Sequence, residues 1–378
     1  MFSDTSKTKK TYKTVSSSFG KNLKVTIFGG SHEPHIGVTM SGLPDGIPID
    51  LDQIRRFLAR RAPGNSIFTT PRKEADEPEV LSGLLDGKTT SEPLTFLIRN
   101  TNTRSGDYAA HQDIPRPAHA DYTAAVKYGG TINMAGGGPF SARMTAPLCI
   151  AGAIALQLLE DRGISIGAHL YSIEKVQDTP FDPVQVQTND FAVVRSHSLP
   201  VLNESKGHAM EEAIRAAMSE GDSVGGMVEC CALGLPPGVG GPMYDGLEGH
   251  LSQIFFGIPA VKGVEFGNGF DCASLRGSQN NDAFTMDGDR VRTITNHHGG
   301  ILGGISSGMP LICRLAFKPT PSIAKEQHSV SLCNKTNETM HITGRHDPCV
   351  AIRAVPVVEA AMAVGLLDLL LECDKFLY

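Results

Sequence analysis

Residues 351–371 read Ala351-Ile-Arg-Ala-Val-Pro-Val-Val-Glu-Ala-Ala-Met-Ala-Val-Gly-Leu-Leu-Asp-Leu-Leu-Leu371, an almost continuous apolar stretch near the end of a 378-residue sequence. A membrane-spanning helix needs about 20 predominantly apolar residues. Three charged residues, Arg353, Glu359 and Asp368, interrupt this stretch. We therefore interpret it as a helix buried in the core of a soluble protein, and we expect no membrane contact.

The rest of the sequence alternates between helix-like periodicity and short β-rich runs. The other predicted helices are Leu51–Arg61, Ala142–Arg162, Lys206–Ser219 and Tyr244–Phe256. The predicted strands are Lys24–Phe28, Gly37–Ser41, Glu79–Leu84, Leu94–Ile98, Ile166–Ile173, Gly225–Ala232 and Pro310–Ala316. These patterns alone predict a mixed α and β protein.

We expect one domain over residues 18–378, because no stretch within it has the length and composition of a flexible linker. The segment Asp178–Val201 has a weaker pattern and is a candidate insertion. Residues 1–17 are polar and rich in lysine, without the apolar stretch of a secretory signal. We expect them to form a disordered or extended tail, and we expect a cytoplasmic protein.

Composition argues against several classes of partner. The net charge is −6 and charged residues make up 20% of the chain, so no basic face for nucleic acid is expected. The eight cysteines include no CxxC pair and no clustered Cys/His spacing. We therefore expect no metal site and no disulfide framework, with the thiols packed as small apolar groups.

Two histidines lie in motifs that suit proton transfer. The motif Phe28-Gly-Gly-Ser-His-Glu-Pro-His35 follows a predicted strand, so its glycine turn presents Ser31 and His32 at a strand end. The motif Arg116-Pro-Ala-His119-Ala-Asp121-Tyr122 puts a carboxylate two residues from His119, which favours the cationic imidazole. Each motif by itself is also compatible with an ordinary surface loop.

Three further motifs suit anions. Gly136-Gly-Gly-Pro-Phe-Ser141-Ala-Arg143-Met-Thr145 opens an apolar run and predicts a helix N-terminus, which attracts anions; a plain helix start is the alternative. Lys318-Pro-Thr-Pro-Ser322, one strand after the glycine-rich run 296–307, offers a cation and two hydroxyls to a phosphate. Gly344-Arg345-His-Asp347-Pro-Cys349 is either a salt-bridged helix start or a catalytic cluster.

In this order and spacing, the five motifs resemble the chorismate synthase family from about Ser18 to Glu372. Supporting strings include Arg60-Arg61 with Pro63-Gly64, Arg104-Ser-Gly-Asp-Tyr108, Ala260-Val-Lys-Gly-Val-Glu265 and Arg276-Gly-Ser-Gln-Asn280. The resemblance implies an α+β fold, a β-α-β sandwich with helices between antiparallel sheets, and a homotetramer. The implied reaction is an anti-1,4-elimination of phosphate from 5-enolpyruvylshikimate 3-phosphate (EPSP), giving chorismate for aromatic amino acid biosynthesis.

The resemblance also implies a cofactor and residue roles. Reduced flavin mononucleotide (FMN) is required but not consumed overall, and NADPH enters, if at all, only as a reductant. His32 matches the histidine that helps phosphate leave, His119 the one that protonates the reduced flavin, and Asp347 an aspartate that acts near flavin N5. The implied flavin contacts are Ser141, Gln253, Gly300, Lys318, Thr320, Ser322 and Arg345. The implied substrate contacts are Ser31, Arg61 and Arg143.

Six positions depart from the commonest family pattern. An acidic residue is replaced by Gly30, a glycine by Glu33, three arginines by Ile67, Ala135 and Pro139, and an acidic residue by Met144. Each lost charge-assisted phosphate contact would forfeit about 1.5–3 kcal/mol. Compensation is expected from nearby cations: Arg60, Arg72, Arg104, Arg116, Arg143 and His35. The alternative is a homologue that binds FMN but has a changed substrate or no activity.

Overall fold

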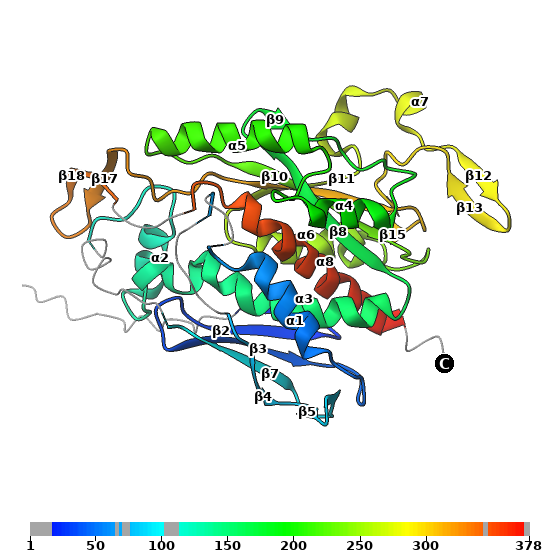
Figure 1. Cartoon of the computed structure of the whole chain (residues 1–378), viewed down its shortest axis with the longest axis horizontal. Coiled ribbons are helices and arrows are strands. Elements are labelled where there is room, and N and C mark those ends of the chain that lie inside the picture. The colour runs from blue at the N-terminus through cyan, green and yellow to red at the C-terminus, as the bar shows by residue number, and fades with distance from the viewer. Residues whose placement is uncertain (1–16, 65–67, 70–75, 102–112, 343–346, 374–378) are drawn as a thin grey trace, which may run out of the picture.

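Two antiparallel sheets enclose a layer of helices in the computed structural model, which describes residues 17–64, 68–69, 76–101, 113–342 and 347–373 (Figure 1). The first sheet has the order β1-β2-β3-β7-β4, formed by Ser18–Phe19, Lys24–Gly29, His35–Ser41, Leu94–Arg99 and Glu79–Ser82. The second has the order β11-β16-β10-β8-β9, formed by Val261–Phe266, Leu311–Phe317, Gly226–Leu233, Ser165–Ile173 and Val176–Gln177. The expected sandwich is confirmed.

The helix layer consists mainly of α1 (Leu51–Arg61), α3 (Thr145–Glu160), α6 (Leu247–Phe256) and α8 (Ala351–Cys373). Helices α3 and α8 lie side by side between the sheets (Figure 1). Gly152 permits this approach, because a Cβ there would come within 2.2 Å of the Cβ of Ala360. The predicted buried helix at 351–371 is thus the centre of the molecule.

The two buried acidic residues inside α8 are paired with residues that are distant in sequence. Glu359 accepts hydrogen bonds from Arg60 at 2.5 and 2.8 Å. Asp368 accepts from the backbone N–H of Leu23 at 2.7 Å and lies 3.1 Å from Nε2 of His250. A buried charge inside an apolar helix is stable only when it is paired in this way. The two carboxylates therefore link α8 to the segments that carry Arg60, Leu23 and His250.

Two segments, Ala142–Glu160 and Ala351–Glu372, are long and apolar enough to cross a membrane by length and composition alone. Both are mostly buried inside the protein. Their apolar surfaces are covered by the two sheets and by each other, as expected for core helices.

The remaining elements cover the outer face of the second sheet or project from the sandwich. Helices α4 (Thr188–Ser196) and α5 (Glu204–Ser219) pack against the second sheet. A hairpin of β12 (Phe284–Asp287) and β13 (Arg290–Thr293) extends away from the body with α7 (Gly277–Asn280), as the yellow segment in Figure 1 shows. We call residues 277–293 the arm. The other elements are β5 (Leu84–Leu85), β6 (Lys88–Thr89), α2 (Asp121–Tyr128), β14 (Ile301–Leu302), β15 (Ile305–Ser306), β17 (Gln327–Ser331) and β18 (Thr336–Met340).

The candidate insertion at Asp178–Val201 is an integral part of the fold. It contains α4, and the carboxylate of Asp178 lies 3.1 Å from Nδ1 of the buried His169 in β8. The other imidazole nitrogen of His169 lies 2.9 Å from Glu229 in β10. Burial opposes protonation of this imidazole, but the two carboxylates outweigh burial and raise the pKa of His169.

Candidate active site

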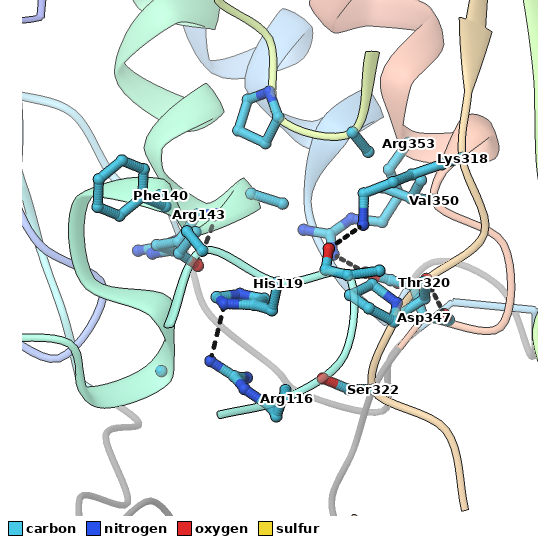
Figure 2. A pocket seen from close by; sticks show the side chains of 18 of the residues that line it. Arg116, His119, Phe140, Arg143, Lys318, Thr320, Ser322, Asp347, Val350 and Arg353 are labelled. Carbon is cyan, nitrogen blue, oxygen red and sulfur yellow. Dashed lines mark hydrogen bonds and ion pairs between the residues drawn. The ribbon is translucent and has the colours of Figure 1, made fainter. Parts of the chain in front are cut away.

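A cavity of about 310 Å³ opens where α1 ends, α3 and α8 begin, and the loop after β16 passes (Figure 2). Among the described residues that line it are five cations, Arg61, Arg116, Arg143, Lys318 and Arg353, and one carboxylate, Asp347. The lining also includes the predicted site residues His119, Ser141, Thr320 and Ser322. Four of the five predicted motifs therefore contribute residues that line one cavity, although they are distant in sequence.

The glycines at 136–138 bring the two predicted catalytic histidines to one turn. A Cβ at Gly136 would lie 2.0 Å from Nδ1 of His32, and a Cβ at Gly137 would lie 3.2 Å from Nε2 of His119. All three glycines have positive φ, at 62°, 92° and 52°. His32 contacts Gly136, which lines the cavity, while His119 lines the cavity itself.

The prediction that these glycines form a helix N-terminus is wrong. They belong to a 3-10 segment, Ala135–Phe140, and α3 begins only at Thr145, after a second short turn at Ala142–Met144. Three successive residues with positive φ cannot start a right-handed helix. Their function is to let side chains approach the backbone closely. Ser31 uses this approach, because its hydroxyl donates to the carbonyl of Ala135 at 3.1 Å and lies 3.2 Å from Nδ1 of His32.

His119 is held by a carboxylate and an arginine. Its Nδ1 lies 2.7 Å from Oδ1 of Asp121 and 3.1 Å from a terminal nitrogen of Arg116. Arg116 also donates to the carboxylate of Asp121 at 2.7 and 2.8 Å. Burial opposes ionisation of Asp121, but the hydrogen bonds from Arg116 and His119 outweigh it and keep the pKa of Asp121 below its ordinary value. The Nδ1 side of the ring is thereby fixed, and Nε2 is the atom available to a ligand.

The guanidinium groups of Arg61, Arg143 and Arg353 meet at the junction of α1, α3 and α8. Arg61 donates to Thr145 Oγ1 at 3.1 Å, to Asp76 Oδ2 at 2.9 Å and to the carbonyl of Ala142 at 3.0 Å. Burial and the nearby charge of Arg353 lower the pKa of Arg61 to about 10, so it stays protonated at neutral pH. Arg353 in turn donates to the carbonyl of Arg61 at 3.0 Å.

The opposite wall is formed by the turn after β16 and by the residues that precede α8. Lys318 donates to the carbonyl of Ala118 at 2.8 Å, and Thr320 donates to the carbonyl of Asp347 at 2.7 Å. Burial and the charge of Lys262 lower the pKa of Lys318. Arg353 donates to the carboxylate of Asp347 at 2.9 Å. In Figure 2, His119 lies between this wall and the wall that carries Arg143.

Three residues predicted as flavin contacts are not found in the described lining of this cavity. Gln253 is exposed on α6. Gly300 lies in a turn in which its N–H donates to Asn296 Oδ1 at 2.8 Å. Arg345 lies outside the described residues. No described residue of the glycine-rich run 296–307 lines the cavity, whereas the Lys318 turn does.

Two residues at this junction were missed as site residues by the sequence analysis. Arg353 was treated as a charge that interrupts an apolar helix, but it lines the cavity and pairs with Asp347. Asp76 pairs with both Arg61 and Arg143, and no local motif marks it. A buried guanidinium requires a compensating acid, but nothing in the sequence indicates which acid it is.

None of the described positions that depart from the family pattern is itself part of the cavity lining. Glu33 is exposed, and its carbonyl accepts from Asn100 at 2.8 Å. Ala135 and Pro139 belong to the 3-10 segment without lining the cavity, and Met144 is buried in the core. Gly30 accepts a hydrogen bond from the N–H of Glu33 at 3.0 Å. Ile67 lies outside the described residues.

The predicted compensating cations divide into three groups. Arg116 and Arg143 line the cavity. Arg60 does not compensate, because Glu359 binds it in the core, and His35 is exposed on β3. Arg72 and Arg104 lie outside the described residues.

Comparison with known proteins identifies one family. The sequence profile of the chorismate synthase family matches residues 23–371. The chorismate synthase of Lancefieldella parvula is 45% identical over 371 residues, covering 94% of this chain and 96% of that protein. The chorismate synthase of Thermococcus kodakarensis is 44% identical over 353 residues, covering 93% and 97%. A crystal structure of chorismate synthase aligns with a TM-score of 0.74 at 26% identity, covering 94% of this chain and 93% of that one.

Proposed function

This chain belongs to the chorismate synthase family, and on that premise we propose which residues of the cavity carry out the family's reaction. The protein is a carbon–oxygen lyase of the shikimate pathway that eliminates phosphate from EPSP to give chorismate. The elimination breaks one C–O bond and one C–H bond, so it needs groups that stabilise the departing phosphate and groups that move a proton.

One observation carries the assignment of roles: two imidazoles contact adjacent glycines of one turn, beside a cavity lined by five cations. Such a site favours two anions at once, because cations in a partly buried cavity attract phosphate and carboxylate strongly. Substrate and reduced FMN are both anionic. When bound, reduced FMN supplies electron density to the breaking C–O bond transiently, so that it is not consumed overall.

The hydroxyl groups of the Lys318 wall, together with Ser141 from the Arg143 side of the cavity, suit the cofactor. Lys318 offers a cation, and Thr320, Ser322 and Ser141 offer hydroxyls on the cavity surface. We assign these four residues to FMN, since a cation with converging hydroxyls is a common way to hold a phosphate or a polar ring edge.

The arginine wall suits the substrate. We assign Arg61 and Arg143 to its anionic groups, with Ser31 and His32 next to the departing phosphate, where the imidazole holds a proton for it. His119 holds a proton at Nε2, which faces the glycine turn, for transfer to the flavin. Asp347 acts beside the flavin, and Arg353 keeps its carboxylate in place.

Gln253, Gly300 and Arg345 remain proposed flavin contacts by resemblance to the family. Gln253 is exposed and Gly300 is absent from the described lining. We propose that these two residues serve the cavity of a neighbouring copy within a homotetramer. Exposed apolar side chains on and near the β12–β13 hairpin support an interface between copies: Phe270, Phe284, Met286, Val291 and Ile294.

The homologue that lacks activity finds no support, because the described altered positions do not line the cavity. A cytoplasmic location and a role for NADPH solely as a reductant stay expectations. The expectation for NADPH is tested by measuring turnover without a chemical reductant, in the presence and in the absence of NADPH.

Equilibrium binding of reduced FMN under anaerobic conditions tests the cofactor site. We expect Lys318→Ala to raise the Kd at least about tenfold, because it removes a charge-assisted contact. Lys175→Ala is the matched control, since Lys175 is exposed between β8 and β9 and should leave the Kd unchanged. Equal Kd values for the Lys318 variant and the wild type would contradict the site.

A further inference from the structure

Asp76 joins two arginines of the cavity wall without lining the cavity itself. Its Oδ2 accepts from Arg61 at 2.9 Å, and its Oδ1 accepts from Arg143. The carboxylate is 1% exposed. The backbone of Asp76 has a φ of 48°, in the left-handed region that aspartate tolerates better than most residues.

Both arginines also donate hydrogen bonds to neutral side chains. Arg61 donates to the hydroxyl of Thr145, and Nε of Arg143 donates to Asn100 Oδ1 at 3.1 Å. Arg61 also experiences repulsion from Arg143 and Arg353, which lie near enough to lower its pKa. The carboxylate of Asp76 binds both guanidinium groups and offsets the repulsion between them.

We propose that Asp76 is a positioning residue, which sets the spacing and direction of Arg61 and Arg143 for the anionic groups of the substrate. The proposal rests on the substrate roles assigned above to these two arginines. Asp76 acts through them and contacts no ligand.

Two physical effects of removing the Asp76 charge oppose each other, and this gives the test its direction. In Asp76→Asn the cavity becomes more positive, which by Coulomb's law alone would tighten the binding of an anion. The amide, however, offers only one acceptor oxygen and turns an N–H₂ group toward the second arginine. If Asp76 positions the arginines, the misalignment of their guanidinium groups outweighs the more positive charge of the cavity, and substrate binding weakens.

The experiment compares EPSP turnover and EPSP binding in the wild type and in Asp76→Asn. We expect the KM and the Kd measured by titration calorimetry to rise at least about tenfold, which corresponds to about 1.4 kcal/mol. We expect kcat to change less than about threefold, because the arginines hold the substrate in the ground state as well as in the transition state.

The matched control is Glu229→Gln. Glu229 is a buried carboxylate that also binds an arginine, Arg314, at 2.8 Å, and it lies in the second sheet outside the cavity lining. Its variant should lose thermal stability and keep the wild-type KM. Asp76→Glu keeps the charge but displaces it by one methylene, so a rise in KM of about threefold is expected, smaller than for Asp76→Asn.

An unchanged or lowered KM in Asp76→Asn would overturn the proposal, as would an equal rise in Glu229→Gln. If Asp76→Asn does not fold, Asp76→Glu decides, and a wild-type KM in that variant overturns the proposal. A wild-type protein that binds EPSP without converting it defeats the proposed roles in catalysis, and the calorimetric comparison still decides on Asp76. A wild-type protein that does not bind EPSP defeats both.

Discussion

His119 lines the cavity, with Nδ1 fixed by the protein and Nε2 beside Gly137 of the glycine turn. Asp121 and Arg116 together occupy the Nδ1 side, at 2.7 and 3.1 Å. An imidazole held in this way keeps one orientation, which matters because a proton moves efficiently only along an aligned hydrogen bond. The sequence predicted the pair His119–Asp121 correctly. It did not predict that Arg116 would bind the same carboxylate.

We predict that Asp121→Asn lowers kcat by roughly tenfold or more, since the amide no longer fixes the imidazole in one orientation. Steady-state turnover of EPSP with reduced FMN measures this effect. Asp190→Asn is the control, because Asp190 lies in the first turn of α4, outside the cavity lining, and accepts from the N–H of Gln187 at 2.8 Å. Equal losses in both variants would mean that Asp121 supports only the start of its helix.

Asp282 should contribute to the acid stability of the arm. It accepts from the N–H groups of His297 and His298, both at 2.9 Å, and from Thr295 at 2.5 Å. Burial opposes its ionisation, but the hydrogen bonds from Thr295 and His298 prevail and lower the pKa of Asp282 to about 2. A carboxyl whose folded pKa is depressed stabilises the fold above its ordinary pKa, and this stabilisation disappears as the pH falls toward the folded value.

The corresponding prediction concerns the pH range from the ordinary value of 3.8 down to about 2. In this range the free energy of unfolding of the wild type should fall with pH more steeply than that of Asp282→Asn. Denaturant unfolding at several pH values measures both slopes. Parallel slopes would show that Asp282 has the same pKa in the folded and unfolded states.

At the scale of elements, the sequence predicted the core better than the surface. Helices α1 and α8 and the central strands begin and end within a few residues of the predicted bounds, since apolar periodicity marks buried elements. Helix α2 and the β12–β13 and β17–β18 hairpins were missed. They are largely exposed, so burial leaves no periodic pattern in their sequences.

A motif that carries its own chemistry could mark candidate site residues, and of these His119 and Lys318 line the cavity while His32 contacts Gly136 in its lining. Asp76 and Arg353 could not be assigned in this way, because their role depends on which distant side chains the fold brings to them. The glycines at 136–138 show a third case. The helix N-terminus expected there was wrong, since a run of glycines does not specify its φ angles.

We predict that Gly136→Ala lowers turnover at least about tenfold, because the new Cβ would overlap the ring of His32 and displace it. The left-handed backbone at Gly136 adds a strain of about 1–2 kcal/mol. Gly130→Ala is the matched control: Gly130 has a φ of 79°, and a Cβ there meets nothing within 4 Å. The control should be destabilised to a similar degree and retain activity; comparable activities of the two variants would contradict the proposed packing of His32.

For the whole molecule, the exposed arm is the feature that a single copy does not explain. Phe284 and Met286 on β12 are 67% and 63% exposed, in a hairpin that extends away from the body (Figure 1). Exposed apolar patches of this kind mark interaction surfaces. In the proposed homotetramer this arm would pack against another copy.

We predict that Phe284→Asp reduces the oligomeric state, since a charge would be buried in an apolar interface. Light scattering after size-exclusion chromatography measures the mass in solution. Leu85→Asp is the control, because Leu85 is equally exposed, at 67%, on the separate β5–β6 hairpin. A wild-type mass for Phe284→Asp would remove the arm from the interface.

The central claim is that one cavity holds reduced FMN and EPSP with His119 between its two walls. Purified protein, incubated anaerobically with reduced FMN and EPSP, should release phosphate and chorismate in equal amounts. His119→Ala should fold, bind EPSP and lose most of this turnover. Full turnover by the His119 variant, or no chorismate from the wild type with FMN kept reduced, would contradict the account.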